Sequence, residues 1–593
     1  MEPFACEGSR RCNPAETAAR ALDQHGIVLC EGFSEVVECA GGIENSGRIA
    51  SFMEFGRGSA WYVSQETDGT SLTWRTAPAP AESGTEDVVF VFSMALGNGS
   101  PLPQPSGQFD LSINGQKELS FRVTKYLDHW RGDDAHFVFH PRRVEAAAPG
   151  HLLYLDDVIT QESFAAFGLG FLRVPRSRIE PGQPVTITVT PKNSVASQRY
   201  FKIDGAQCIA RTNLFPGLAE VCGDGARPKI GDSFVFFGDI HTHSGWPNGG
   251  CGMGSLDENY TYARDVSNLD IYALTDHDLH MGEPDMWRAR VDAANQYYEP
   301  GEFCVLQAYE FTSSLYGHRN VYYRGDDGPM LACRSEADYW SKTAPTPDDL
   351  WEFLDKSGQR AMTIPHHPPA SSHPLTWDYY SRKYDRLVEV YSSWGNHEVP
   401  LNPMRGYGSD RFEHLSVRDA LLKGYVLGLM ASSDGHDGHP GNNQSPDVKH
   451  HHLYHPLGSG RIGVLEPELT REAVFDAMYE RRCYATTGPH IAMSVTLNGH
   501  PMGSTIKAGD LDGPPVVSAT VSAPWIIERV QVIKSGAIAA DFASTRHAMQ
   551  AEFAWPDSAF NPDKTAFYYV RLTLADGEMA WSSPIWISPG ATV

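Results

Sequence analysis

The stretch Phe234–His243, with the sequence FVFFGDIHTH, decides how the rest of the chain is interpreted. It begins with apolar residues typical of a buried strand and ends in an H-x-H pair, His241 and His243. Side chains alternate between the two faces of a strand, so residues at i and i+2 point the same way. Two such imidazoles at a strand end indicate a metal site, provided that other strands deliver ligands to the same place.

The composition limits the classes of protein to be considered. A chain of 593 residues is expected to hold more than one domain, because single cores rarely grow beyond about 250–300 residues. The formal net charge of −25 argues against nucleic acid or an anionic membrane as a partner. No apolar run approaches the roughly 20 residues of a membrane helix, and the N-terminus lacks a signal-peptide pattern. The ten cysteines include no C-x-x-C pair, so we expect a soluble, cytoplasmic protein.

Changes in sequence pattern predict a lead-in segment, 1–46, and three domains. From 47 to 228, short β-rich runs such as Asp87–Ala95 are separated by Gly, Pro, Asn and Ser, which predicts a β-sandwich or jelly roll. From 229 to 490, strands and helices alternate, which predicts a parallel α/β sheet or barrel. From 491 to 593 the pattern returns to short strands, and we expect a second β-sandwich.

Two helices of the central segment have clear start signals. Ser255 is followed three residues later by Glu258, a capping box that predicts a helix over Leu256–Val266. Thr346, with Pro347 after it, predicts the start of another helix.

Polar clusters follow the predicted strands of the central segment, at the end where α/β barrels keep their active sites. Sixteen of the 24 histidines lie between His241 and His455, and this enrichment favours a centre with several metal ions. Imidazole nitrogen and carboxylate oxygen are the ligands that borderline and hard divalent ions prefer. The predicted metal ligands are His241, His243, His277, Glu310, His318, His366, Asp434 and His436.

The central segment carries a series of motifs in one order: GDIHTHS, ALTDHD, AYEFTS, GHRNVYYR, TIPHHP and SSDGHDG. Over Ser233–His490 these motifs resemble those of the polymerase-and-histidinol-phosphatase (PHP) superfamily of metal-dependent hydrolases. The segments VRDALLKGYVLG, REAVFDAMYERRCYATTGP and YYVRLTLADGEMAWSSPIW resemble its carbaryl-hydrolase-like branch. The resemblance implies a distorted (β/α)7 PHP-type barrel, here flanked by two β-sandwiches. It also implies two to three divalent metal ions, with zinc, manganese or iron as candidates.

The resemblance also implies how the ligands are shared between the ions. His241 and His243 would bind one ion together with Asp434, and Glu310 would bridge to a second ion. The second ion would be completed by two further imidazoles, those of His318 and His366.

A third ion would be held by His277 and His436. Many family members have an Asp or His soon after the H-x-H pair to help there, whereas this chain has Trp246-Pro247-Asn248-Gly249. Asn248 is neither an anion nor an imidazole. The site of the third ion would therefore have one such ligand fewer here than in those family members. Cys251, in the adjacent Gly-rich loop, could be a thiolate ligand, but we expect it to be a small buried residue.

Residues beyond the ligands have more than one interpretation. Arg319 could clamp an anionic substrate or form a salt bridge within the barrel. His367 and His397 are candidates for protonating the leaving group. Asp239 and Asp276 could orient ligand imidazoles or serve as turn carboxylates.

The predicted function is hydrolysis of an ester-type bond in a small-molecule substrate by a metal-bridging hydroxide. A phosphoester, mono- or diester, is favoured by the superfamily resemblance. A carbamate or an aryl carboxylic ester is the alternative that the branch resemblance supports. A non-catalytic protein that binds glycans or partners on a decayed barrel is a second alternative, against which the intact ligand set argues.

Overall fold

The computed structural model describes most of the chain after residue 226 and separate stretches before it. The described residues are 35–40, 48–50, 60–64, 71–79, 88–98, 108–122, 128–131, 135–141, 164–191, 200–211, 227–246, 250–281, 284–313, 315–332, 345–369, 375–400, 414–436, 438–441, 460–524, 527–543, 549–574 and 577–589.

The chain divides into two compact units. The first is Met1–Ala226 with Ala575–Gly577, and the second is Arg227–Leu574 with Glu578–Val593. The division predicted from the sequence is finer than this one and stays a prediction. Most of the predicted lead-in segment, including residues 1–34, lies outside the described residues.

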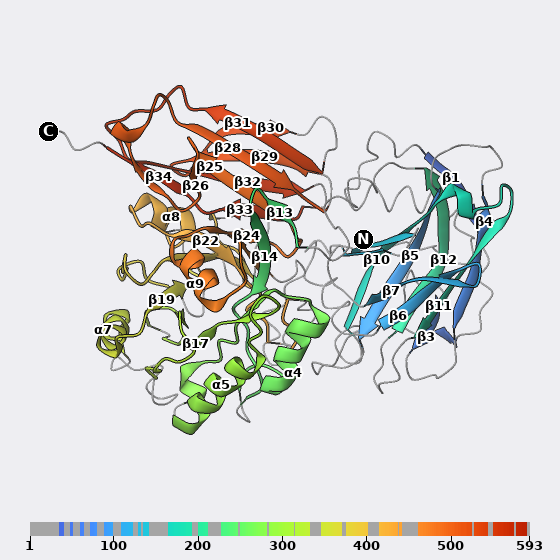
Figure 1. Cartoon of the computed structure of the whole chain (residues 1–593), viewed down its shortest axis with the longest axis horizontal. Helices are drawn as coiled ribbons and strands as arrows, with labels where there is room; N and C mark the ends of the chain where they lie inside the picture. Colours follow the sequence, from blue (N-terminus) through green and yellow to red (C-terminus); the bar gives the residue numbers. More distant parts are fainter. Residues whose placement is uncertain are drawn as a thin grey trace. The chain divides into compact units, whose positions relative to one another are not determined.

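The first unit contains two antiparallel sheets (Figure 1). The larger has the order β2-β3-β12-β5-β10-β9-β8, with β1 paired to β12, and the smaller has the order β4-β11-β6-β7. The strands of the larger sheet are β1 (Glu35–Ala40), β2 (Arg48–Ala50), β3 (Ala60–Ser64), β5 (Val88–Asn98), β8 (Asp128–Arg131), β9 (His136–Pro141), β10 (Phe164–Val174) and β12 (Tyr200–Arg211). Those of the smaller sheet are β4 (Leu72–Pro78), β6 (Gln108–Ile113), β7 (Gln116–Arg122) and β11 (Pro184–Pro191).

The two sheets of the first unit share one core. Trp74 and Phe121 from the smaller sheet are buried in the same cluster as Phe137 from the larger sheet. The rings of Phe121 and Phe137 meet edge to face, with centroids 5.1 Å apart. At the tip of the β6–β7 hairpin, Asn114 and Gly115 have φ angles of 50° and 82°, as expected for an Asn-Gly turn. Two antiparallel sheets over a common core form a β-sandwich.

The largest sheet of the second unit contains β14, the strand that precedes the H-x-H pair. Its main path is β16-β15-β14-β23-β24-β33-β32-β29-β30, and β14 is parallel to β15 but antiparallel to β23. β14 is buried from Val235 onward, and an added Cβ at Gly238 would lie 2.6 Å from the carbonyl oxygen of Ile271. Glycine therefore allows β14 to approach β15 this closely. The strands are β13 (Lys229–Ile230), β14 (Ser233–Asp239), β15 (Ile271–Tyr272), β16 (Cys304–Val305), β23 (Arg461–Glu466), β24 (Cys483–Thr486), β27 (Thr505–Lys507), β29 (Ile527–Lys534), β30 (Ala537–Ala543), β32 (Ala566–Leu574), β33 (Met579–Ser582) and β34 (Ile585–Ser588).

Smaller sheets of the second unit have the orders β17-β18-β19, β21-β20-β22 and β26-β25-β28-β31. The first two carry further polar clusters at their strand ends, and the third lies among the late strands, coloured orange to red in Figure 1. Their strands are β17 (Gln307–Phe311), β18 (Arg319–Tyr323), β19 (Ala361–Pro365), β20 (Leu387–Ser392), β21 (Gly395–Asn396), β22 (Gly428–Ala431), β25 (Ala492–Leu497), β26 (His500–Pro501), β28 (Val516–Ser522) and β31 (Gln550–Pro556).

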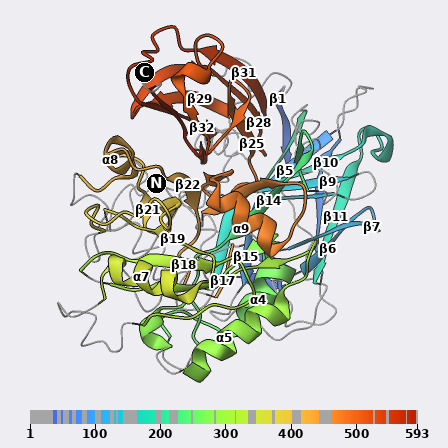
Figure 2. The same ribbon diagram turned by 60° about the vertical axis from the view of Figure 1, so that its left-hand side comes forward.

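Helices lie on the outside of the second unit, as α4, α5 and α7 show in Figures 1 and 2. The capping box of Ser255 and Glu258 is present at the start of α4, and Thr346 caps α7 with Pro347 at its first turn. Both predicted helix starts are thus confirmed, although α4 ends at Thr261 and continues as a π-helix to Val266. The α-helices are α4 (Leu256–Thr261), α5 (Pro284–Tyr297), α7 (Pro347–Ser357), α8 (Val417–Leu422) and α9 (Arg471–Tyr479).

The predicted parallel (β/α)7 barrel is not shown by these sheets. The described residues are mostly in strands, with few helices, and β17, β18 and β19 run antiparallel. For β17 and β18 the physical reason is the connection, because residues 312–318 are too few for the crossover of a dozen or more residues that parallel strands need. Only part of the expected arrangement is present, in the parallel pairs β14–β15, β15–β16 and β20–β22.

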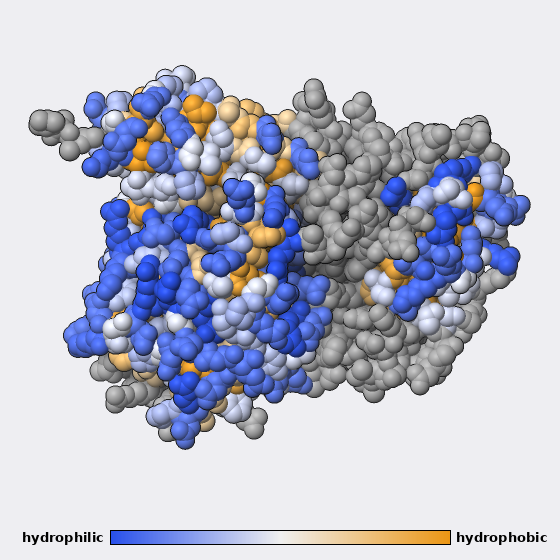
Figure 3. Space-filling model, in the orientation of Figure 1, coloured by the Kyte–Doolittle hydropathy of each residue, from blue (hydrophilic) through white to orange (hydrophobic). Residues whose placement is uncertain are grey.

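The visible face of the second unit is mainly hydrophilic, with small apolar patches between the charged residues (Figure 3). Among the described residues, no helix is both long and apolar enough to cross a membrane.

Candidate metal centre

The structure brings all eight predicted ligands together at strand ends of the second unit. Their ligand atoms fall into three groups, and within each group the atoms lie within 4.8 Å of one another. The first group is His241, His243 and Asp434; the second is Glu310, His318, His366 and His367; the third is His243, Cys251, His277 and His436. We call the first two groups, without His367, the Glu310 centre, and the third the Cys251 group.

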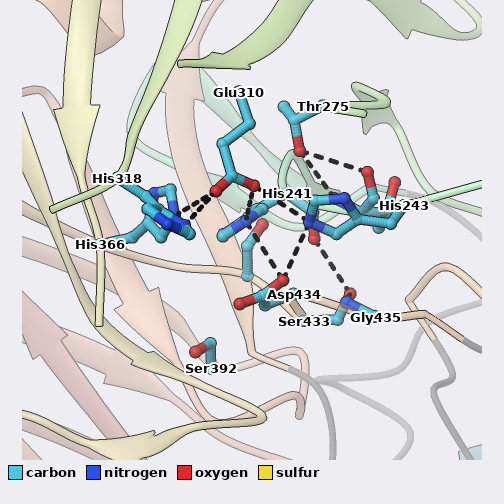
Figure 4. A network of polar contacts seen from close by, with 12 residues as sticks. His241, His243, Thr275, Glu310, His318, His366, Ser392, Ser433, Asp434 and Gly435 are labelled. Carbon is cyan, nitrogen blue, oxygen red and sulfur yellow. Dashed lines mark hydrogen bonds and ion pairs between the residues drawn. The ribbon is translucent and has the colours of Figure 1, made fainter. Parts of the chain in front are cut away.

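Glu310, on β17, lies in the middle of the Glu310 centre (Figure 4). Its Oε2 atom faces the H-x-H pair, 3.5 Å from Nε2 of His241 and 3.2 Å from Nε2 of His243. Its Oε1 atom faces the other side, 2.5 Å from Nδ1 of His318 and 3.2 Å from Nε2 of His366. One carboxylate thus presents one oxygen to each set of imidazoles, which is the arrangement of a bridging ligand.

Asp434 completes the side of the centre that contains the H-x-H pair. Its Oδ1 atom lies 3.3 Å from Nε2 of His241 and 3.1 Å from Nε2 of His243. The backbone of Asp434 is left-handed, with φ of 48°, and that of His367 is similar, with φ of 32°. Such conformations cost about 1–3 kcal/mol in residues other than glycine and concentrate at functional sites.

Around the H-x-H pair, the spacing of the ligand atoms fits a shared metal ion better than direct hydrogen bonds. Ligand atoms that bind one ion at about 2.0–2.2 Å stand roughly 3.0–3.6 Å apart, which covers the separations between the H-x-H pair and both carboxylates. His241 Nε2 and both ring nitrogens of His243 are buried and have no hydrogen-bond partner. Buried polar atoms are rarely left unpaired, and nitrogen with carboxylate oxygen suits zinc, manganese or iron. The residues present therefore fit divalent metal ions.

The electrostatics of the centre favour a cation. Burial by itself would raise the pKa of Glu310, but the surrounding imidazoles, first that of His277, outweigh it and hold this pKa well below its usual range. The pKa of Asp434 is held low in the same way, chiefly by His241. Burial would lower the pKa of His241, but Asp434 and Glu389 raise it to about 10. Buried carboxylates thus depend on positive charge beside them, which a divalent ion supplies.

Glu389, on β20, orients His241. Its Oε2 atom accepts a hydrogen bond from Nδ1 of His241 at 2.8 Å, and both side chains are fully buried. A proton held on Nδ1 leaves Nε2 free to bind a metal, as is usual for ligand imidazoles. Sequence reasoning missed Glu389, although a single carboxylate inside the apolar run Leu387–Tyr391 is a usable signal, because buried charges are almost always paired.

Two other imidazoles are held through Nδ1, and that of His277 also lies 3.4 Å from Oε1 of Glu310. Nδ1 of His277 lies 2.7 Å from the hydroxyl of Thr312, which itself donates to the carbonyl of Glu310. Nδ1 of His436 donates to the carbonyl of Asp434 at 2.9 Å. In both cases Nδ1 is held by a neighbouring oxygen, which fixes the orientation of the ring.

Asp239 and Asp276 hold loops rather than imidazoles. Asp239 accepts from the backbone N–H groups of Ser433 and Gly441, at 2.9 and 2.7 Å. Asp276 accepts from the backbone N–H and the hydroxyl of Ser244, at 2.6 and 2.9 Å. The first therefore fixes the loop that carries Asp434, and the second fixes the chain directly after His243.

Arg319 is not brought into the Glu310 centre. Its guanidinium is fully buried, lies 3.6 Å from Asp385, and donates to the carbonyls of Tyr316 and Tyr379. It also lies over the ring of Trp351. Of the two interpretations that the sequence left open, this placement favours the internal salt bridge over the substrate clamp.

The two candidate proton donors lie beside the centre. His367 shares the ligand group of Glu310, and its ring is 4.8 Å from that of Trp394. Burial, followed by the charge of His366, holds the pKa of His367 well below its usual value. Nε2 of His397 donates to the carbonyl of Trp394 at 3.3 Å, and burial lowers its pKa to about 4. The lowered pKa values favour the neutral form of both imidazoles.

Cys251 lies within the third group of ligand atoms, contrary to its interpretation as a merely small residue. Burial would raise the pKa of its thiol, but His243, His277 and His436 hold that pKa well below the usual value. Asn248, three residues earlier, lies outside the described residues.

Parts of this chain are similar in sequence to uncharacterised proteins. A family model described as "Protein of unknown function (DUF3604)" matches residues 258–393 and 423–497, less than half of the chain. These segments include Glu310 and Asp434 but not the H-x-H pair. An uncharacterised protein of Chlamydia pneumoniae is 27% identical over 347 residues, which cover 55% of this chain and 53% of the relative. One of Chlamydia trachomatis is 27% identical over 355 residues, covering 56% and 55%, so the chain spans about half the length of these relatives.

Among solved structures, the chain is similar to a two-domain protein from Bacteroides vulgatus that contains a predicted PHP-like metal-dependent phosphoesterase. The identity is 13%, and the match covers 60% of this chain and 97% of the other. The TM-score of 0.31 is too low to establish a common fold.

Proposed function

We propose that the protein is a metal-dependent hydrolase that cleaves an ester bond at the Glu310 centre. The observation that carries this proposal is the carboxylate of Glu310, which presents Oε2 to His241 and His243 and Oε1 to His318 and His366. Two ligand sets on either side of one carboxylate suit a pair of neighbouring divalent ions. Such ions, when bound, lower the pKa of a coordinated water and polarise the ester oxygen.

The residues of the chain have separate tasks in this reaction. Glu389 holds the proton on Nδ1 of His241 and so keeps Nε2 available as a ligand. Water forms a bond to the phosphorus or carbonyl carbon, the bond to the leaving oxygen breaks, and that oxygen takes up a proton. His367 and His397, neutral and adjacent to the centre, are the candidates for passing on this proton.

We also propose that the strands around this centre form a distorted PHP-type barrel. Support comes from isolated parallel bridges that link separate sheets: Thr242 to Gly435, His277 to Glu310, and Thr363 to Asp385. Two of these bridges join the ends of strands that carry candidate ligands.

A phosphoester is the substrate that we favour, because the sequence motifs resemble those of the PHP superfamily. A carbamate or an aryl carboxylic ester is the second candidate, and the placement of Arg319 supports it. With its guanidinium beside Asp385, Arg319 is not available to balance the charge of a phosphate monoester.

A hydrolysis panel on metal-reconstituted protein tests the proposal. Nitrophenyl phosphate mono- and diesters are compared with nitrophenyl acetate and naphthyl carbamate, each with and without chelator. We expect chelator-sensitive hydrolysis of the phosphoesters. Activity on the carbamate alone would overturn the phosphoester preference, and activity that chelator leaves unchanged would overturn the metal centre itself.

A further inference from the structure

The Cys251 group gathers further candidate ligand atoms beside the Glu310 centre. It places one sulfur atom with the imidazoles of His243, His277 and His436, and one ligand atom from each lies within 4.8 Å of the others. Four such residues at this spacing are the number and kind that a tetrahedral zinc site uses.

The loop that carries Cys251 is held firmly against the strand end. The backbone N–H of Gly252 donates to the carbonyl of Ser244 at 3.0 Å, and that of Gly245 donates to the carbonyl of Gly254 at 2.8 Å. A Cβ added at Gly252 would lie only 2.2 Å from the carbonyl oxygen of His243, so only glycine permits this approach. The sequence Gly250-Cys251-Gly252 therefore fixes the thiol beside the H-x-H pair.

His243 is the imidazole of the group whose ring nitrogens are both buried without a hydrogen bond. His243 is 1% exposed, and neither of its ring nitrogens has a hydrogen-bond partner. His277 and His436 each use Nδ1 in a hydrogen bond, to Thr312 and to the carbonyl of Asp434, and each has a ligand atom within 4.8 Å of those of Cys251 and His243. An unpaired, buried imidazole beside a thiol is a strong indication that a cation belongs between them.

We propose that Cys251, as a thiolate, binds a third divalent ion together with His277 and His436, and that its sulfur makes this position select zinc. His243 is the additional imidazole within reach. Binding releases the thiol proton to solvent. The inference deepens the proposed function, on which it rests for the neighbouring ions, and it gives the third ion an anionic ligand, which the amide of Asn248 is not.

Sulfur gives this position a different preference from the Glu310 centre. Thiolate is a soft ligand that favours zinc and other thiophilic ions, whereas carboxylate oxygen also accepts manganese and magnesium. A protein loaded with manganese is therefore expected to fill the Glu310 centre and leave the Cys251 group to zinc.

Cobalt titration of the metal-free full chain tests the sulfur ligand directly. Co²⁺ bound to a thiolate gives a charge-transfer band in the near ultraviolet, which nitrogen and oxygen ligands do not give. We expect this band in the wild type and its loss in Cys251→Ser, with one equivalent of cobalt fewer per chain. Cys483→Ser is the control, because Cys483 is also a free cysteine but is buried in the core beside Ser583, and it should keep the band. A band that persists in Cys251→Ser, or is lost in Cys483→Ser, would overturn the assignment.

Two further measurements keep the test valid if Cys251→Ser folds poorly. Cys251→His offers a nitrogen in place of sulfur, and we expect it to keep the metal count but lose the band. In the wild type, zinc should protect Cys251 from alkylation, as peptide mass spectrometry can show, and X-ray absorption should find sulfur at about 2.3 Å from zinc. Equal alkylation with and without zinc would overturn the proposal.

The outcomes separate this inference from the proposed function. If the protein binds two cobalt ions without a charge-transfer band and its hydrolysis still depends on metal, the Cys251 site fails and the proposed function stands. If the chain binds no cobalt at all, both fail.

Discussion

Replacement of Glu389 by alanine is expected to weaken metal binding at the Glu310 centre while the protein stays folded. The carboxylate accepts the Nδ1 proton of His241 at 2.8 Å, and both side chains are shielded from water. A hydrogen bond to a charged group contributes about 1.5–3 kcal/mol, and each ~1.4 kcal/mol corresponds to a factor of ten in affinity. Without this bond His241 can turn or change tautomer, so we expect zinc affinity to fall about 10- to 100-fold.

The assay is a competition titration of zinc between the metal-free protein and a chromophoric chelator. Glu389→Gln keeps the size of the side chain and one acceptor oxygen, so its affinity should lie between those of the wild type and Glu389→Ala. Glu398→Gln is the control, because Glu398 is an equally buried carboxylate that binds Arg571 and Trp581 instead of a ligand imidazole. Wild-type zinc affinity in Glu389→Ala, or an equal loss in Glu398→Gln, would refute the reasoning.

Further predictions concern the bridging carboxylate, metal removal, a buried ion pair and a helix cap. Glu310→Gln removes the negative charge that the two ligand sets share. The metal content of the Glu310 centre, measured by elemental analysis, should therefore fall from about two ions per chain to fewer than one, and an unchanged content would contradict the bridging role. Chelator should lower Tm by several degrees in a thermal scan, because the ions bind only the folded state; an unchanged Tm would argue against tightly bound metal. Glu398→Gln should lower the free energy of unfolding, measured by urea denaturation, by roughly 2–3 kcal/mol. This is less than the roughly 3–5 kcal/mol lost when a fully buried ion pair is broken, because Arg571 is 16% exposed. Ser255→Ala should remove about 1 kcal/mol through the loss of the α4 cap, whereas a neutral result would mean that the cap is redundant.

The strands of the second unit could largely be predicted from the sequence, but their directions could not. The apolar runs at Leu387–Tyr391 and Arg461–Leu465 match β20 and β23 closely, because burial and β-propensity act locally. Direction depends on the length of the connection, and the short segment 312–318 makes β17 and β18 antiparallel. That length was visible in the sequence and should have outweighed the pattern of alternating strands and helices.

Site residues that belong to a sequence motif could be predicted. Site residues that only the tertiary structure brings to the centre were missed. The histidines beside strand ends, such as His241 and His318, come together as expected. Arg319 follows His318 directly, yet side chains alternate along a strand, so its guanidinium points to Asp385 on the other side. Glu389 and Cys251 belong to no motif, and the sequence alone did not separate Cys251 from a small buried residue. Folding places Glu389 beside His241 and Cys251 beside His243, His277 and His436.

The bond between His241 and Glu389 joins residues that are 148 positions apart along the chain. Closing so long a loop is entropically unfavourable, and contacts of this kind form late in folding. A nascent or partly folded chain therefore has no correctly oriented imidazole to offer, and loose histidines would bind ions only weakly. Tight metal binding at the Glu310 centre would then follow, rather than precede, the folding that brings His241 and Glu389 together.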